Sequence, residues 1–255
     1  MSQYDEVFFD YVNRGAIASA NILLPILHKE LPIQSVLDVG CGEGGWLHVW
    51  QTLGVKDVFG IDGDYVIRDR LLIPKDRFQA EDLAQPFSLS RRFDLVQSLE
   101  VGEHLPEASA SAFVGSLVAH TDMVLFSAAV VGQGGDQHIN EQPLSYWRQK
   151  FAEHGFVPVD AVRPHLHDHA EIEPWYRYNA VLYVRDSVLS ELSDALRDRV
   201  VGSEEPIHDY SPPLYRVRKQ IIKCLPTSFA TFLAKQKERM TMRKASREQQ
   251  QQDAV

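Results

Sequence analysis

Residues 36–46 read V-L-D-V-G-C-G-E-G-G-W, a short apolar run that passes into glycines. The apolar run predicts a buried strand. The glycines that follow it predict a turn free of Cβ atoms just before a helix; they are Gly40, Gly42, Gly44 and Gly45. A flat nucleoside can lie against the bare backbone of such a turn. We therefore expect a nucleoside cofactor at this turn.

The glycine spacing alone does not choose the cofactor, because Gly40, Gly42 and Gly45 also satisfy G-x-G-x-x-G, the dinucleotide fingerprint. Asp38 lies two residues before the first glycine. A carboxylate at that position repels a pyrophosphate, but it attracts the ammonium and sulfonium groups of S-adenosylmethionine. Asp38 therefore favours the cationic cofactor.

Two further acids follow predicted strands. The run V-F-G-I-D ends in Asp62, whose carboxylate would accept hydrogen bonds from both ribose hydroxyls. Asp82 and Leu83 follow the next predicted strand, where they would meet the adenine amine and the adenine ring face. Three acids, each after a strand, form a pattern that a nicotinamide cofactor does not need.

With these residues, the chain resembles the class I S-adenosylmethionine-dependent methyltransferases over residues 30–185. The resemblance rests on four segments in order: D-V-G-C-G-E-G-G-W, G-I-D-G-D, E-D-L and F-D-L-V-Q-S-L-E-V-G-E-H-L-P. It implies a Rossmann-like α/β fold, with a seven-stranded, mostly parallel sheet, an antiparallel last strand and helices on both faces. It also implies that Asp38 and the glycines lie near the methionine part of the cofactor, and that Ser98 to Glu100 lie beside the transferable methyl group.

The order of predicted elements agrees with an α/β fold, because short β-rich runs alternate with helical segments. Helices are expected at 14–29, 108–119 and 146–154. Parallel strands are expected at 35–40, 56–61, 77–80, 93–98 and 121–128. Two further β-rich runs, 156–162 and 178–184, would form the antiparallel hairpin that the resembled family has at the sheet edge.

The chain is predicted to contain a methyltransferase domain with an N-terminal helix, residues 1–200, and a basic amphipathic extension, residues 201–255, whose end is disordered. Residues 214–255 hold ten Lys or Arg and three acids, a net charge of +7. Because the whole chain has a net charge of −9, residues 1–213 carry −16. The extension could contact a membrane surface or a partner. The acidic domain argues against a nucleic-acid acceptor.

Composition indicates a soluble, cytoplasmic protein. Cys41 and Cys224 suggest no disulfide framework. The N-terminus, M-S-Q-Y-D-E, has no basic and apolar leader, and no apolar run approaches about 18 residues.

Candidate catalytic groups follow the fourth and fifth predicted strands. Glu100, Glu103 and His104 come after the fourth, and His138 lies in the loop after the fifth. Because the carboxyl ends of parallel strands meet at one edge of the sheet, these side chains should converge. A hydroxyl or carbon acceptor must lose a proton during methyl transfer, so a base or a metal ion is expected there.

Three interpretations of these residues stay open. The spacing E-x-x-E-H with a later histidine resembles small-RNA 2′-O-methyltransferases and, in part, ubiquinone-pathway O-methyltransferases, which implies that Glu100, Glu103, His104 and His138 bind Mg²⁺, Mn²⁺ or Zn²⁺. Alternatively, His138 or His104 acts as a general base without a metal. In the third interpretation, His104 only caps and orients the helix that begins near Pro106.

The sequence therefore predicts an S-adenosylmethionine-dependent O-methyltransferase that acts on a hydroxyl of a small molecule or glycan. The segment G-G-D-Q-H-I-N-E, with Y-W downstream, resembles methyltransferases encoded beside bacterial glycosyltransferases. Two alternatives are a metal-assisted RNA 2′-O-methyltransferase and a non-catalytic scaffold that binds the cofactor.

Overall fold

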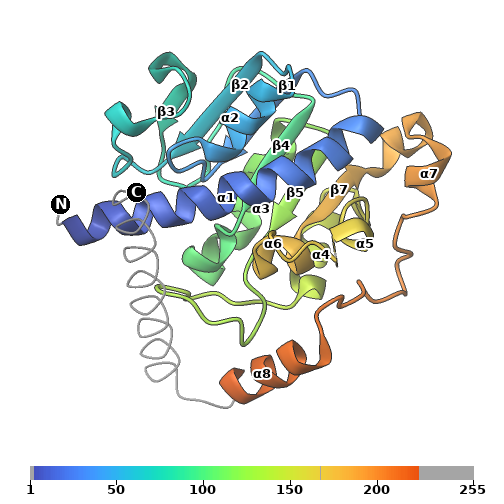
Figure 1. The fold of residues 1–255 in the computed structure, drawn as a ribbon. Coiled ribbons are helices and arrows are strands. Elements are labelled where there is room, and N and C mark those ends of the chain that lie inside the picture. Colours follow the sequence, from blue (N-terminus) through green and yellow to red (C-terminus); the bar gives the residue numbers. More distant parts are fainter. Residues whose placement is uncertain (1–2, 167, 224–255) are drawn as a thin grey trace.

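The computed structural model describes residues 3–166 and 168–223, with the backbone alone for residues 3–12. Its centre is a seven-stranded sheet in the order β3-β2-β1-β4-β5-β7-β6 (Figure 1). The strands are β1 Ser35–Val39, β2 Asp57–Asp62, β3 Phe78–Ala80, β4 Leu95–Leu99, β5 Met123–Ser127, β6 Phe156–Val159 and β7 Val181–Arg185. β7 runs antiparallel to β5 and β6, and the other pairs are parallel. The predicted fold class is confirmed.

Helices cover both faces of the sheet. The α-helices are α1 Gln3–Glu30, α2 Gly45–Thr52, α3 Ala110–Ala119, α4 Leu144–Ala152, α5 Arg163–Leu166, α6 Pro174–Asn179, α7 Asp194–Arg197 and α8 Pro213–Lys223. Short 3-10 helices are η1 Arg68–Arg70, η2 Lys75–Arg77, η3 Gly102–His104, η4 Glu107–Ser109 and η5 Asp186–Glu191. One core cluster joins α1, α2, α5 and α6 to the sheet, and a second joins α3 and α4 to the opposite face. Figure 1 shows α1 running across the first face.

The central strands are buried on both sides, as parallel strands between helical layers must be. Val36, Leu37 and Val39 of β1 have no exposed surface. A tryptophan anchors each face. Trp50 of α2 donates a hydrogen bond to Gln97 Oε1 at 2.8 Å, while Trp147 of α4 packs on Phe126 with ring centroids 4.9 Å apart. This packing fixes the strand ends from which the site is built.

The structure differs from the expected elements at two places. The first helix begins at Gln3 instead of residue 14. Tyr178, expected in the last strand, lies in α6, which starts at Pro174. Proline is favoured in the first helical turn because an N–H group at that position would have no hydrogen-bond partner within the helix, so its absence costs nothing.

The segment after β7 is tied to the edge of the sheet. Arg163 is fully buried and donates to both carboxylate oxygens of Asp160, at 2.9 and 2.8 Å, and to the carbonyls of Tyr178 and His208, at 3.1 and 3.0 Å. The backbone N–H of Val201 donates to Pro158 O at 2.9 Å. Hydrogen bonds therefore cross the expected boundary at residue 200.

Of the expected basic extension, residues 201–223 are described and end in α8. The remainder, residues 224–255, with its predicted disordered end, lies outside the described residues. Among the helices that the structure describes, none has the length and apolarity required to span a bilayer.

Candidate functional site

The turn after β1 forms a cradle of bare backbone. Gly40, Gly42 and Gly44 have φ angles of 86°, 54° and 86°, a region that residues with a Cβ rarely adopt. A Cβ on Gly40 would lie 2.2 Å from Val101 Cγ2, whereas a Cβ on Gly42 would meet no atom within 4 Å. The backbone at Gly42 therefore faces open space that a ligand can fill, directly before α2.

Asp38 lies beneath this cradle with an unsatisfied carboxylate oxygen. Its side chain is 3% exposed, and its Oδ2 atom is buried without a hydrogen-bond partner among the described residues. Burial raises the pKa of Asp38 to about 7, the neighbouring Gln97 amide opposes the rise, and the charge of Asp62 adds to it. A buried carboxylate in this state is best satisfied by a cationic ligand.

Asp62 ends β2 beside the glycine turn. Its Oδ2 atom accepts from Gly42 N at 2.6 Å, and its Oδ1 atom accepts from Gly63 N at 2.7 Å and from the Tyr65 hydroxyl. Tyr65 is otherwise 75% exposed. The Tyr65 hydroxyl thus occupies the kind of hydrogen bond that the sequence assigned to a ribose hydroxyl, and a nucleoside would replace it.

The remaining predicted cofactor residues have different surroundings. Asp82 is exposed, and its Oδ1 atom accepts from Ala84 N at 3.0 Å, while Leu83 is buried. Ser98 is fully buried, and its hydroxyl donates to Val39 O at 2.8 Å. Ser98 therefore joins β4 to β1, so its own hydroxyl is not presented to a ligand.

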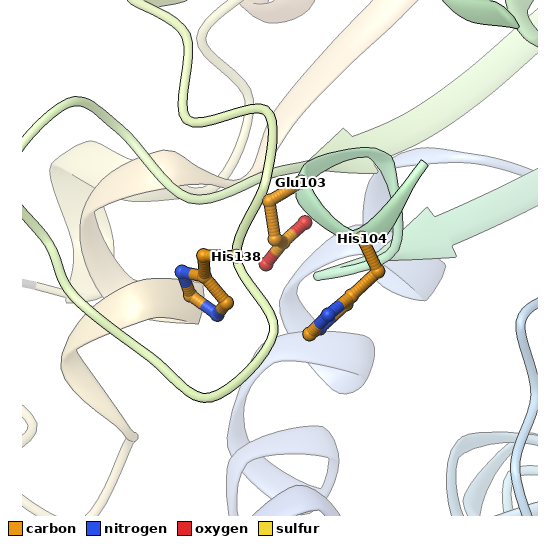
Figure 2. Close-up of side chains that lie close together, drawn as sticks. All are labelled: Glu103, His104 and His138. Atoms are coloured by element: carbon orange, nitrogen blue, oxygen red, sulfur yellow. The ribbon is translucent and has the colours of Figure 1, made fainter. Parts of the chain in front are cut away.

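Three predicted catalytic or metal-binding side chains converge at the same edge of the sheet. Glu103, His104 and His138 each place one ligand atom within 4.8 Å of the others. Figure 2 shows Glu103 and His104, from η3, meeting His138 from the loop after β5. The two imidazole rings are 5.0 Å apart and nearly perpendicular. His104 Nδ1 lies 3.3 Å from Gln137 O, so this nitrogen contacts the loop and not a helix N-terminus.

The carboxylate of Glu103 is the least satisfied group in this cluster. The residue has no exposed surface, and both carboxylate oxygens lack a hydrogen-bond partner within the described part of the chain. Burial, followed by the charge of Glu100, raises the pKa of Glu103 well above its ordinary value. Burial and the charge of His138 lower the pKa of His104. A cation would satisfy the Glu103 oxygens and could take ring nitrogens of the two histidines as further ligands.

Glu100 lies beside Glu103 but outside the set of three converging ligand atoms. Its backbone φ angle is 57°, an unusual value for a residue with a Cβ, and its N–H donates to Ser127 O at 3.0 Å. Its Oε2 atom accepts from Gln133 Nε2 at 2.8 Å, while Oε1 is buried without such a partner. Burial raises the pKa of Glu100, and Gln133 opposes the rise.

The loop after β5 is fastened so that His138 reaches η3. The carbonyl oxygen of Glu103 accepts from Ile139 N at 2.9 Å and from Asn140 N at 3.0 Å. The Asn140 amide donates to Gly102 O at 3.3 Å. The position of His138 is therefore set by the backbone of the segment that carries Glu103.

Glu141 was missed by the sequence analysis, although it lies three residues after His138. Its carboxylate accepts from Gly132 N and Gly134 N at 2.8 and 2.7 Å, and lies 3.0 Å from His138 Nδ1. Burial acts to raise the pKa of Glu141, but the contacts with His138, Gly132 and Gly134 outweigh burial and lower it. Glu141 thus engages Nδ1 of His138 and leaves Nε2 for another partner. The H-x-x-E spacing was the available signal.

The cradle and the cluster are adjacent. Val101, which limits the space at Gly40, lies between Glu100 and Glu103 in sequence. β1 and β4, which carry the two groups of residues, are neighbours in the sheet. The glycine turn and the cluster therefore lie beside each other, at the carboxyl ends of two neighbouring strands.

Comparisons with known proteins identify the family of the chain and its fold. The model of the family described as methyltransferase domain matches residues 10–161. Among solved structures, the sugar N-methyltransferase KedS8 from Streptoalloteichus sp. ATCC 53650 is similar, with 17% identity, a TM-score of 0.51, and coverage of 66% of this chain and 87% of that chain. DesVI from Streptomyces venezuelae has 23% identity and a TM-score of 0.44; the match covers 53% of this chain and 62% of DesVI, less than two thirds of its length. No curated protein matches the chain.

Proposed function

Since the chain belongs to the methyltransferase domain family and uses S-adenosylmethionine, we propose that it methylates a hydroxyl group of a small molecule or glycan. The observation that carries this proposal is the buried Glu103 carboxylate beside His104 and His138. A hydroxyl acceptor must lose a proton as it attacks the methyl carbon, whereas an unprotonated amine attacks with its own lone pair and needs only orientation. A cluster able to hold a cation or accept a proton is therefore best explained by a hydroxyl acceptor.

The residues of the cradle fit the cofactor. The orphaned Oδ2 atom of Asp38 would face the positive charge of its methionine part, and the open backbone at Gly42 would accept its flat nucleoside. Asp62 would bind the ribose, and Asp82 and Leu83 would line the adenine. When bound, the cofactor supplies a methyl group on a sulfonium leaving group that is already activated. The protein then contributes mainly alignment.

At the cluster, Glu103, His104 and His138 would hold a divalent cation, and the neighbouring Glu100 would add negative charge beside it. When bound, such an ion lowers the pKa of an acceptor hydroxyl. His138 and His104 would also be placed to accept the released proton, so a metal-free reaction would use the same residues. An RNA acceptor is disfavoured by the charge of −16 on residues 1–213.

Binding and product measurements test this function. In isothermal titration, S-adenosylmethionine and its demethylated product should bind, and NADH should not. With Mn²⁺ present, a panel of sugars should yield demethylated cofactor from hydroxyl-bearing members. Because KedS8 is a sugar N-methyltransferase, the panel should pair each sugar with its amino analogue. Methylation confined to the amino sugars would reject the hydroxyl acceptor, and binding of NADH alone would reject the cofactor.

Substitutions at His138 separate catalysis from cofactor binding. His138→Ala should lower turnover far more than affinity for S-adenosylmethionine, because the imidazole lies at the cluster and not at the cradle. Glu141→Gln should lower turnover by roughly 10- to 100-fold, as expected when a residue that orients a histidine is lost. Glu107→Gln, an exposed change in η4, is the matched control. Unchanged turnover in His138→Ala would remove this residue from the catalytic role.

A further inference from the structure

Helix α8 has two different faces. Tyr215, Arg218, Lys219 and Ile222 are half-buried and turn towards the body of the protein. The exposed face carries Leu214, Val217 and Ile221, whose side chains are 85%, 56% and 59% exposed. Their i, i+3, i+7 spacing places these three side chains on one stripe of the helix. An aliphatic stripe of this kind on the outer surface of a helix indicates an interaction surface.

The inner face of α8 is firmly attached beside the candidate site. Arg218 donates to Gln133 O at 3.3 Å, and Lys219 Nζ donates to Asp209 Oδ2 at 2.9 Å. Lys219 O lies so near Gly132 that a Cβ there would be 2.2 Å away. The Tyr215 ring lies 5.6 Å from that of Tyr178. Because these contacts orient the helix, the exposed stripe has a fixed direction, which a docking surface requires.

The charges around the stripe favour an anionic partner. Helix α8 contains four cations and no acid, and among them Arg216 and Lys223 are exposed. Residues 214–255 have a net charge of +7, whereas the preceding residues carry −16. An anionic surface would therefore attract the cations of α8 and repel the acidic body of the protein, which orients the molecule.

We propose that the exposed face of α8 docks on an anionic lipid bilayer. The aliphatic side chains of Leu214, Val217 and Ile221 enter the boundary between headgroups and acyl chains, and the nearby cations contact anionic headgroups. Nucleic acid would engage the cations but gain little from a bare aliphatic stripe. A second copy of this chain is a less favourable partner, because its acidic body would repel that of the first. Docking would hold the loop that carries His138 close to the membrane surface.

Vesicle flotation with the full-length protein tests this proposal. Phosphatidylcholine vesicles containing phosphatidylglycerol should bind the protein at least tenfold more than vesicles of phosphatidylcholine alone. The triple variant Leu214→Ser, Val217→Ser, Ile221→Ser should lose at least tenfold in binding to the anionic vesicles. The matched control, Leu214→Ile, Val217→Ile, Ile221→Leu, keeps the aliphatic surface and should bind like the wild type. Affinity for S-adenosylmethionine should be equal in all three proteins, which checks the fold.

Each other result overturns the proposal. Equal vesicle binding by the triple serine variant would assign binding to the charge of the extension alone. If wild-type protein fails to bind anionic vesicles and the serine variant is thermally less stable, the stripe packs within the chain. Binding of an RNA oligonucleotide that the serine substitutions leave unchanged, without vesicle binding, would identify nucleic acid as the partner.

Discussion

The Glu103→Gln variant is expected to bind Mn²⁺ at least about 100-fold more weakly than the wild type, because loss of a ligand should exceed the effect of losing a residue that merely orients one. Both oxygens of Glu103 are buried without a hydrogen-bond partner in the described residues. An amide keeps the shape of the side chain but removes its charge and one donor oxygen. Electron paramagnetic resonance of free Mn²⁺ measures the change without knowledge of the acceptor.

Loss of fold would not explain this result. Burial and the charge of Glu100 raise the pKa of Glu103, so the ionised carboxylate is unfavourable in the folded protein when no cation is bound. The neutral glutamine should therefore leave the melting temperature unchanged or raise it. Glu107→Gln serves again as the control. If the wild type binds no Mn²⁺, or keeps full turnover after exhaustive chelation, the metal proposal fails and the histidines remain as bases.

The Asp38→Asn variant should lose about 30-fold or more in affinity for S-adenosylmethionine. The substitution is nearly isosteric and removes one partner of a buried charge pair, a change that costs about 2–5 kcal/mol. Asp64→Asn is the matched control, since Asp64 is exposed and pairs with Arg68 on the surface. Isothermal titration measures both affinities. Equal affinity of Asp38→Asn and wild type would place the cofactor charge elsewhere.

The raised pKa of Asp38 adds a pH dependence. With a pKa of about 7, the carboxyl is largely protonated in the free protein below neutrality and ionised above it. A cationic cofactor binds the ionised form, so affinity should rise with pH across neutrality, with release of a proton. Buffers of different ionisation enthalpy reveal that proton in titration, and Asp38→Asn should show none. The contribution of Asp38 to the stability of the free protein has the opposite trend, and it falls as the pH rises from the ordinary pKa of an aspartate towards about 7.

The succession of strands along the chain and the place of the candidate site were predictable because they follow from local signals, whereas the sheet topology was implied by the family resemblance. The apolar run 36–39 with its glycines, and the acids at 38 and 62, report the ends of buried strands. Convergence of Glu103, His104 and His138 follows from parallel strands ending at one edge. The assigned roles of these residues stay predictions, because proximity does not identify a bound ion.

Other parts of the site depend on contacts that sequence does not encode locally. Glu141 orients His138 only because Gly132 and Gly134 turn their N–H groups towards it. Ser98 lies in the expected place, but its hydroxyl bonds across the sheet to Val39, 59 residues away. Short helices such as α6 were missed because residues 174–177 lie in the connection between the two last β-rich runs, and six residues are too few to show a helical period.

The buried guanidinium of Arg163 ties the segment after residue 200 to the edge of the sheet. One of its hydrogen bonds reaches His208, beyond the expected boundary at residue 200, while the others hold Asp160 and Tyr178. A chain that ends at residue 200 would lose the His208 carbonyl, so the buried, positively charged Arg163 would lack one of its hydrogen-bond acceptors. The segment after residue 200 is therefore part of the packed edge of the sheet, and it fixes the point from which α8 starts.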